Sequence, residues 1–104
     1  MIDENAMRVL WTPRAIEDLK TISRFISTNN PQAARRFSDK LKRRAESLCT
    51  FPNRGRIVPE ISRDDVLELI EGNYRIVYRI QKDAVHLLAI FEAHKLLQLS
   101  EVKE

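Results

Sequence analysis

The stretch at residues 72–80, GNYRIVYRI, contains the side chains best suited to hold an anion. Its alternation is typical of a β-strand, in which successive side chains point to opposite faces of the sheet. Arg75, Val77 and Arg79 therefore share one face, and the tyrosines and isoleucines share the other. Each arginine presents a planar fork of donors that matches a phosphate or a carboxylate. The pattern predicts a cationic sheet face with apolar contact points.

We expect this face to bind an acidic partner, because helices should cover the tyrosine and isoleucine face and leave the arginines open. Leu88, in the next apolar run, should add a further apolar contact to Arg75, Val77 and Arg79. The alternative is a solvated face on which the arginines only form cross-strand pairs with Glu68 or Glu92.

A second group of reactive side chains follows the last apolar run, at Glu92, His94 and Lys95. Cleavage of RNA without a metal needs a proton acceptor, a proton donor and cations around the phosphate. His94 could titrate near neutral pH, and Arg75 could lie across the sheet from it and hold the phosphate. These four residues are the candidate catalytic set of a ribonuclease. The alternative for His94 is an ordinary surface histidine.

Basic residues are concentrated between positions 35 and 56, where eight lysines and arginines face only two acidic residues. The basic residues are Arg35, Arg36, Lys40, Lys42, Arg43, Arg44, Arg54 and Arg56. The simplest interpretation is a solvated helix face around an apolar stripe. If the stretch is functional, it should attract nucleic acid or the ribosome independently of sequence and with a steep dependence on salt.

Length and composition exclude several classes of protein. The 104 residues, 43% of them hydrophobic, suit one compact domain that spans residues 1–104. The chain shows neither an apolar run that could span a membrane nor a secretory signal, so we expect a soluble cytoplasmic protein. One cysteine and two histidines offer no zinc-site spacing, so we expect no metal and no cofactor. Residues 1–7 should be an N-terminal extension, and residues 92–104 a tail or short helix.

Apolar spacing predicts two antiparallel helices that begin at Pro13 and Pro31. Thr12 and Asn30 precede these prolines and should act as N-caps. The predicted buried stripes are Ala15, Leu19, Ile22 and Ile26 in the first helix, and Ala34, Phe37, Leu41, Ala45 and Leu48 in the second. Trp11 and Phe25 should be core aromatics.

Strand patterns surround these helices. Arg8–Thr12 should form a first strand, and Val66–Glu71, Tyr74–Ile80 and Ala84–Phe91 should form hairpins. Between the helices and the hairpins, Phe51–Pro59 should be a loop packed down by Phe51 and Val58. The predicted fold class is α+β, with two helices on one face of a mainly antiparallel sheet of about four strands.

Four short motifs, in this order, resemble the RelE/ParE superfamily of bacterial type II toxins, also called plasmid stabilisation proteins. They are Ala15, Asp18 and Leu19; the Asn-Pro-x-x-Ala of Asn30 to Ala34; the Phe-Pro-x-x-Gly of Phe51 to Gly55; and the Tyr-Arg-x-x-Tyr of Tyr74 to Tyr78. The resemblance covers about Arg8 to Lys95. It implies a small α+β fold, growth inhibition, and neutralisation by an acidic antitoxin in a hetero-oligomer.

The resemblance also implies one of two targets. ParE-like members poison DNA gyrase without cutting anything themselves, whereas RelE-like members cut messenger RNA in the ribosome. The stretch from Asn30 to Pro59 follows the ParE-like pattern more closely, so we expect a gyrase poison. The alternatives are a ribosome-dependent ribonuclease and an inactive protein that only binds its antitoxin.

Overall fold

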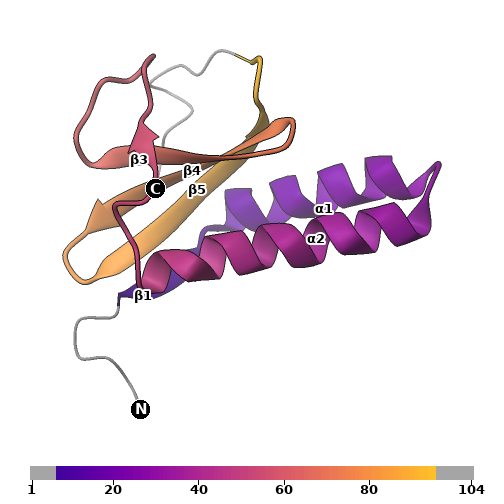
Figure 1. The fold of residues 1–104 in the computed structure, drawn as a ribbon, viewed down its shortest axis with the longest axis horizontal. Coiled ribbons are helices and arrows are strands. Elements are labelled where there is room, and N and C mark those ends of the chain that lie inside the picture. The colour runs from indigo at the N-terminus through magenta and orange to yellow at the C-terminus, as the bar shows by residue number, and fades with distance from the viewer. Residues whose placement is uncertain (1–6, 96–104) are drawn as a thin grey trace.

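The computed structural model describes residues 7–95, which form an α+β fold with two helices packed on one face of a five-stranded sheet (Figure 1). The elements are β1 (Arg8–Trp11), α1 (Pro13–Ser27), α2 (Pro31–Glu46), a 3-10 turn η1 (Ser47–Cys49), β2 (Arg56–Ile57), β3 (Val66–Glu71), β4 (Tyr74–Gln81) and β5 (Ala84–Glu92). The strand order is β1-β5-β4-β3-β2, and only β1 with β5 is a parallel pair. The predicted fold class is confirmed.

Both helices begin where the capping residues predict. The Thr12 side chain accepts a hydrogen bond from the Ala15 N–H (3.2 Å), and the Asn30 side chain accepts one from the Ala33 N–H (3.0 Å). A proline follows each cap, at a position where its missing N–H is not needed. Neither α1 nor α2, the two α-helices of residues 7–95, is long and apolar enough to cross a membrane.

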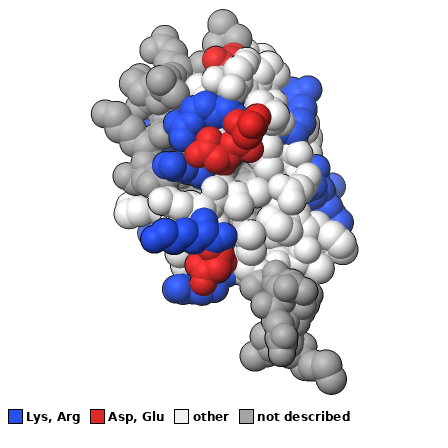
Figure 2. Space-filling view, turned by 90° about the vertical axis from the view of Figure 1, so that its left-hand side faces the viewer, with Lys and Arg blue, Asp and Glu red and all other residues white. Residues whose placement is uncertain are grey.

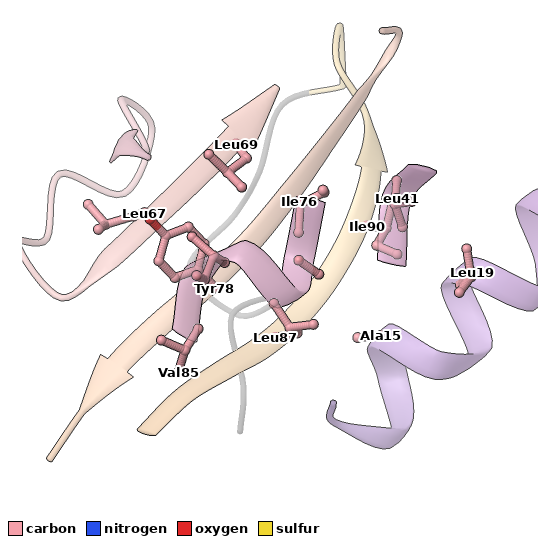
Figure 3. Close-up of a cluster of buried hydrophobic side chains, with 12 residues drawn as sticks. Ala15, Leu19, Leu41, Leu67, Leu69, Ile76, Tyr78, Val85, Leu87 and Ile90 are labelled. Carbon is pink, nitrogen blue, oxygen red and sulfur yellow. The ribbon is translucent and has the colours of Figure 1, made fainter. Parts of the chain in front are cut away.

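The main hydrophobic core lies between the helices and the sheet (Figure 3). Ala15 and Leu19 of α1 and Leu41 and Ala45 of α2 pack on Leu67, Leu69, Ile76, Tyr78, Val85, Leu87 and Ile90 of the sheet. The tyrosine and isoleucine face of β4 is therefore the covered face, as the alternation predicts. Burial of each large aliphatic side chain in such a core stabilises the fold by roughly 1.5–3 kcal/mol.

The opposite face of the sheet is not open, which corrects the expectation for Val77 and Leu88. Both side chains are buried in a second hydrophobic cluster with Val58, Val66, Ala89 and Phe91, and Ile61 packs against it. Leu88 is an extra residue in β5, because Val77 pairs with Ala89 while the next residue of β4 pairs with Leu87. The segment between β2 and β3 covers this face, so Val77 and Leu88 offer no exposed apolar contact.

Four further expectations need correction. Phe25 is 74% exposed because the helical hairpin extends beyond the sheet at this end (Figure 1), and Phe51 is 54% exposed. Within the predicted loop, Arg56–Ile57 forms the short strand β2 on the edge of β3. Met7, assigned above to an extension, packs against the main core and donates its N–H to the Cys49 carbonyl (2.9 Å). The remaining residues of both predicted tails, 1–6 and 96–104, lie outside the described residues.

Candidate functional site

Arg75 lies at the centre of a buried ion-pair network. Its side chain is only 4% exposed, and its Nε donates to Glu68 Oε1 (2.6 Å). Its two terminal nitrogens donate to the two carboxylate oxygens of Glu60 (2.7 and 2.9 Å), and one of them also donates to the Lys95 carbonyl (2.9 Å). The predicted exposure of Arg75 is therefore wrong: its donor fork is occupied by carboxylates of the chain itself.

Glu68 is the most deeply buried acid of this network. Its side chain is 0% exposed, and it accepts from Arg75 and from Arg56 Nε (2.8 Å). The alternative weighed from the sequence was a solvated face with cross-strand pairs to Glu68 or Glu92. The pair of Arg75 with Glu68 is confirmed, but the solvated face is not, because both side chains are buried. Glu60 was not anticipated, because it lies in the irregular segment before β3, where no periodicity predicts which residue it contacts.

The network holds Arg75 in its charged form. Hydrogen bonds to Glu60 raise the pKa of the Arg75 guanidinium, and those to Glu68 act in the same direction, whereas burial opposes them. A buried cation with this many partners fixes the sheet to the covering segment. It also means that an incoming phosphate would have to displace two carboxylates before it could reach Arg75.

Arg79 forms a second, more exposed ion-pair group. Its side chain is 27% exposed, and its Nε donates to Asp65 Oδ2 (2.8 Å). Asp65 also accepts two hydrogen bonds from Arg63 (2.8 and 3.1 Å), and these, together with the Arg79 charge, lower the pKa of its carboxyl, although burial opposes them. Both arginines of GNYRIVYRI therefore form ion pairs with acids of the segment between β2 and β3, Arg75 with Glu60 and Arg79 with Asp65.

A view of one side of the molecule agrees with this pairing (Figure 2). In the two charged groups on the left-hand half of the picture, red side chains lie directly against blue ones, and uncharged surface separates the groups. These two groups are therefore neutralised pairs and not the cationic floor that the alternation predicts, although further blue side chains lie along the right-hand edge of the view.

Tyr78 anchors the loop before β2 from inside the core. Its hydroxyl donates to the Pro52 carbonyl (2.7 Å) and accepts from the Gly55 N–H (2.9 Å). A side chain at position 55 has no room, since an added Cβ would lie 2.6 Å from this hydroxyl and 2.5 Å from the Glu68 carbonyl oxygen. These contacts explain why the sequence has glycine after Phe-Pro and tyrosine at the end of Tyr-Arg-x-x-Tyr.

The candidate proton-transfer residues lie at the exposed end of β5. His94 Nε2 is 3.2 Å from Glu92 Oε2, and both side chains are largely exposed, at 83% and 61%. They line a shallow hollow of about 340 Å³ with Asn73, Tyr74 and Ala93. Lys95 lies over the Phe91 ring, with its Nζ 5.7 Å from the ring centre. The fold thus brings His94 and Glu92 together, but the Arg75 guanidinium is bound to Glu60 and Glu68 instead.

A hollow between β1 and the two helices was not anticipated. Its volume is about 510 Å³, and it is lined by Trp11, Ile16, Leu19, Lys20, Lys42 and Glu46. Ile16 is 41% exposed there. The signal in the sequence was Ile16 itself, an isoleucine that lies off the predicted buried stripe of its helix.

The predicted basic patch is divided between paired and unpaired side chains. Lys40 and Arg44 both reach Glu71 (3.2 and 3.0 Å), and Arg56 pairs with Glu68. Arg35, Arg36 and Arg43 are exposed, and Arg54 lies over the Phe51 ring. Among residues 7–95, no group of three or more His, Cys, Asp or Glu side chains is arranged to hold a metal.

The fold has a counterpart among solved structures. The structure is similar to one titled "Chromosomal ParDE TA system from P. aeruginosa", with a TM-score of 0.72, 20% identity, and coverage of 88% of this chain and 100% of that one. The family model described as the ParE toxin of the type II toxin-antitoxin system parDE matches residues 9–96. The chain therefore belongs to the ParE toxin family of type II toxin-antitoxin systems, within the RelE/ParE superfamily.

Curated relatives agree with this assignment. The chain is 36% identical to Toxin RelE2 of Caulobacter vibrioides over 89 residues, which are 86% of this chain and 98% of that protein. It is 33% identical to Putative toxin Y4kP of Sinorhizobium fredii over 88 residues, or 85% of this chain and 90% of that protein. Toxin RelE1 of C. vibrioides is 30% identical over 83 residues, which cover 80% of this chain and 89% of that protein. The chain is the toxin of a type II toxin-antitoxin system.

Proposed function

We propose that this chain is a cytoplasmic ParE-like toxin that poisons DNA gyrase and is neutralised by an acidic antitoxin. The observation that supports a non-nucleolytic toxin is the state of Arg75. This arginine is the cation expected to hold a scissile phosphate, but it is buried with Glu60 and Glu68. His94 and Glu92 lack the phosphate clamp that RNA cleavage requires at the same place.

The second candidate function is ribosome-dependent cleavage of messenger RNA. It is favoured by the exposed His94–Glu92 pair and by two curated relatives that are named RelE2 and RelE1. The third is an inactive protein that binds its antitoxin and harms nothing. These three candidate functions predict different first effects in the cell: DNA damage, loss of intact messenger RNA, or no effect on growth.

Inducible expression in a bacterium separates them. A gyrase poison arrests growth, causes filamentation and induces the DNA-damage response before messages are shortened. A ribonuclease instead produces truncated messages first, and His94→Ala with Glu92→Ala would relieve its toxicity while leaving the fold intact, since both side chains are exposed. Normal growth at high soluble expression would leave only the antitoxin-binding function.

For the antitoxin we propose the hollow between β1 and the helices as the main contact. Its apolar lining, with Lys20 and Lys42 at its sides, is complementary to an amphipathic acidic segment that folds on binding. The arginine face of the sheet offers no such surface, because Arg75 and Arg79 are already paired with acids.

Replacing both lysines, in Lys20→Glu/Lys42→Glu, should weaken binding of the antitoxin encoded beside this chain by more than about tenfold, since attraction becomes repulsion. Lys82→Glu/Lys95→Glu is the matched control, because it makes the same charge change at two exposed lysines that do not line the hollow. If calorimetric titration gives both variants the same affinity for the antitoxin, the antitoxin binds a surface other than this hollow.

A further inference from the structure

One side of α2 carries a row of basic side chains that the proposed function does not use. On a helix with 3.6 residues per turn, Arg36, Lys40 and Arg43 follow one another at steps of four and three and lie on one side. All three are exposed. Ser47 continues the same line, and Arg54 joins it there, since its Nη1 donates to Ser47 Oγ (3.3 Å). We call Arg36, Lys40, Arg43 and Arg54 the cationic ridge.

The acids near the cationic ridge neutralise only part of it. Glu71 is shared between Lys40 and Arg44, and Arg44 also donates to the Ile70 carbonyl (3.2 Å). Within residues 7–95, Arg36 and Arg43 form no ion pair. Asp39 lies three residues after Arg36 and four before Arg43, so it flanks the cationic ridge, but within residues 7–95 it forms no ion pair with either arginine.

The length of the cationic ridge suits a linear polyanion. From Arg36 to Ser47 the helix rises by about 1.5 Å per residue, which makes a row roughly 16 Å long. A nucleic-acid strand places a charge about every 3.4 Å along a stacked helix, so the row spans about five phosphates. In Figure 1, α2 runs along the lower edge of the helical layer, where no other helix or strand of residues 7–95 covers its outer side.

An exposed aromatic ring ends the cationic ridge. Phe51 is 54% exposed, and the Arg54 guanidinium lies 4.9 Å from its ring centre. The ring borders an open hollow of about 460 Å³ formed by residues 50–54. Exposure of a large aromatic beside a cation is a feature of platforms on which a base stacks while the phosphates contact basic residues. An acidic peptide would use the cations but would not need the ring.

From these features we infer that the cationic ridge and Phe51 bind a single-stranded nucleic-acid segment, with the backbone along α2 and one base on Phe51. This inference goes beyond the proposed function, because it concerns a surface on the outer side of α2 and requires neither gyrase nor the antitoxin. Contact with the backbone should be independent of sequence, and stacking should favour single strands over duplexes.

Fluorescence anisotropy with a labelled 12-nucleotide probe tests the inference, with single-stranded DNA, single-stranded RNA and a DNA duplex compared at several salt concentrations. We expect tighter binding of a single strand than of the duplex. Arg36→Gln/Arg43→Gln should lower the slope of log K against log salt by up to about 1.4, since each phosphate contact on a single strand contributes about 0.7. Phe51→Ala should weaken single-strand binding about tenfold and leave that slope unchanged.

Arg24→Gln/Lys82→Gln is the control for net charge, because it removes two positive charges away from the cationic ridge. Circular dichroism of each variant verifies folding, and all the substituted side chains are exposed. The inference is overturned if the control weakens binding as much as Arg36→Gln/Arg43→Gln does. It is also overturned if the duplex binds as tightly as a single strand and Phe51→Ala has no effect, or if a poly-glutamate peptide competes as well as the oligonucleotide.

Discussion

Replacement of Arg75 by leucine should destabilise the protein strongly, because it leaves a buried carboxylate without its main partner. Glu68 is 0% exposed and is held by Arg75 at 2.6 Å and by Arg56 at 2.8 Å. Removing one partner of a buried ion pair costs about 3–5 kcal/mol. Because Arg56 remains, we expect the lower end of this range, about 3 kcal/mol.

This loss is large for a domain of such size. The free energy of unfolding of small domains is about 5–15 kcal/mol, so Arg75→Leu should remove roughly a fifth to three fifths of it. The melting temperature should fall by more than about 10 °C, since each 1 kcal/mol corresponds to roughly 4–8 °C in domains of this size. Urea unfolding followed by circular dichroism and by the fluorescence of Trp11 measures the free energy of unfolding, and thermal unfolding followed by circular dichroism measures the melting temperature.

Two further variants test the cause. Arg35→Leu replaces an exposed arginine and should change the free energy of unfolding by less than about 0.5 kcal/mol. Arg75→Leu/Glu68→Leu should recover part of the loss, because it removes the unpaired buried charge. The reasoning is refuted if Arg75→Leu is no more destabilising than Arg35→Leu, or if adding Glu68→Leu lowers stability further by its full single-variant cost.

Other predictions concern Tyr78 and its loop. Tyr78→Phe should cost about 1–3 kcal/mol, because the Gly55 N–H and the Pro52 carbonyl lose their partner; Tyr74→Phe is the control. Burial raises the pKa of Tyr78 above its usual value of 10.0, so its contribution is present below pH 10 and is lost as the pH rises through the higher value of the folded state. Tyr78→Phe should therefore lose less stability between pH 9 and 11 than the unmodified protein, and equal losses in urea titrations would contradict this. Gly55→Ala should destabilise by more than about 1 kcal/mol, because its Cβ would clash with the Glu68 carbonyl, and an unchanged melting temperature would show that the loop can shift.

The helices and the main core could be predicted from the sequence because their signals are local. Thr12-Pro13 and Asn30-Pro31 start the helices, and the spacing of Ala15, Leu19 and Leu41 marks the faces they bury. The alternation in β4 likewise assigned each side chain to the correct face.

The environment of the arginine face could not be predicted in the same way. What covers it is the segment that contains Val58, Glu60 and Ile61, which has no periodicity and is placed by contacts with distant strands. The sequence therefore showed that Arg75 and Val77 share a face, but not that this face is closed. The exposure of Phe25 was missed for a related reason, since the length of a helix does not tell where the sheet beneath it ends.

The most direct test of the proposed target uses the purified chain with DNA gyrase. Supercoiling of relaxed plasmid should be inhibited and cleaved DNA should accumulate as the toxin approaches the concentration of gyrase, and the antitoxin should reverse both effects. A parallel reaction with translating ribosomes should leave the messenger RNA intact. Unchanged supercoiling together with shortened messages would contradict the gyrase proposal and establish the ribonuclease instead.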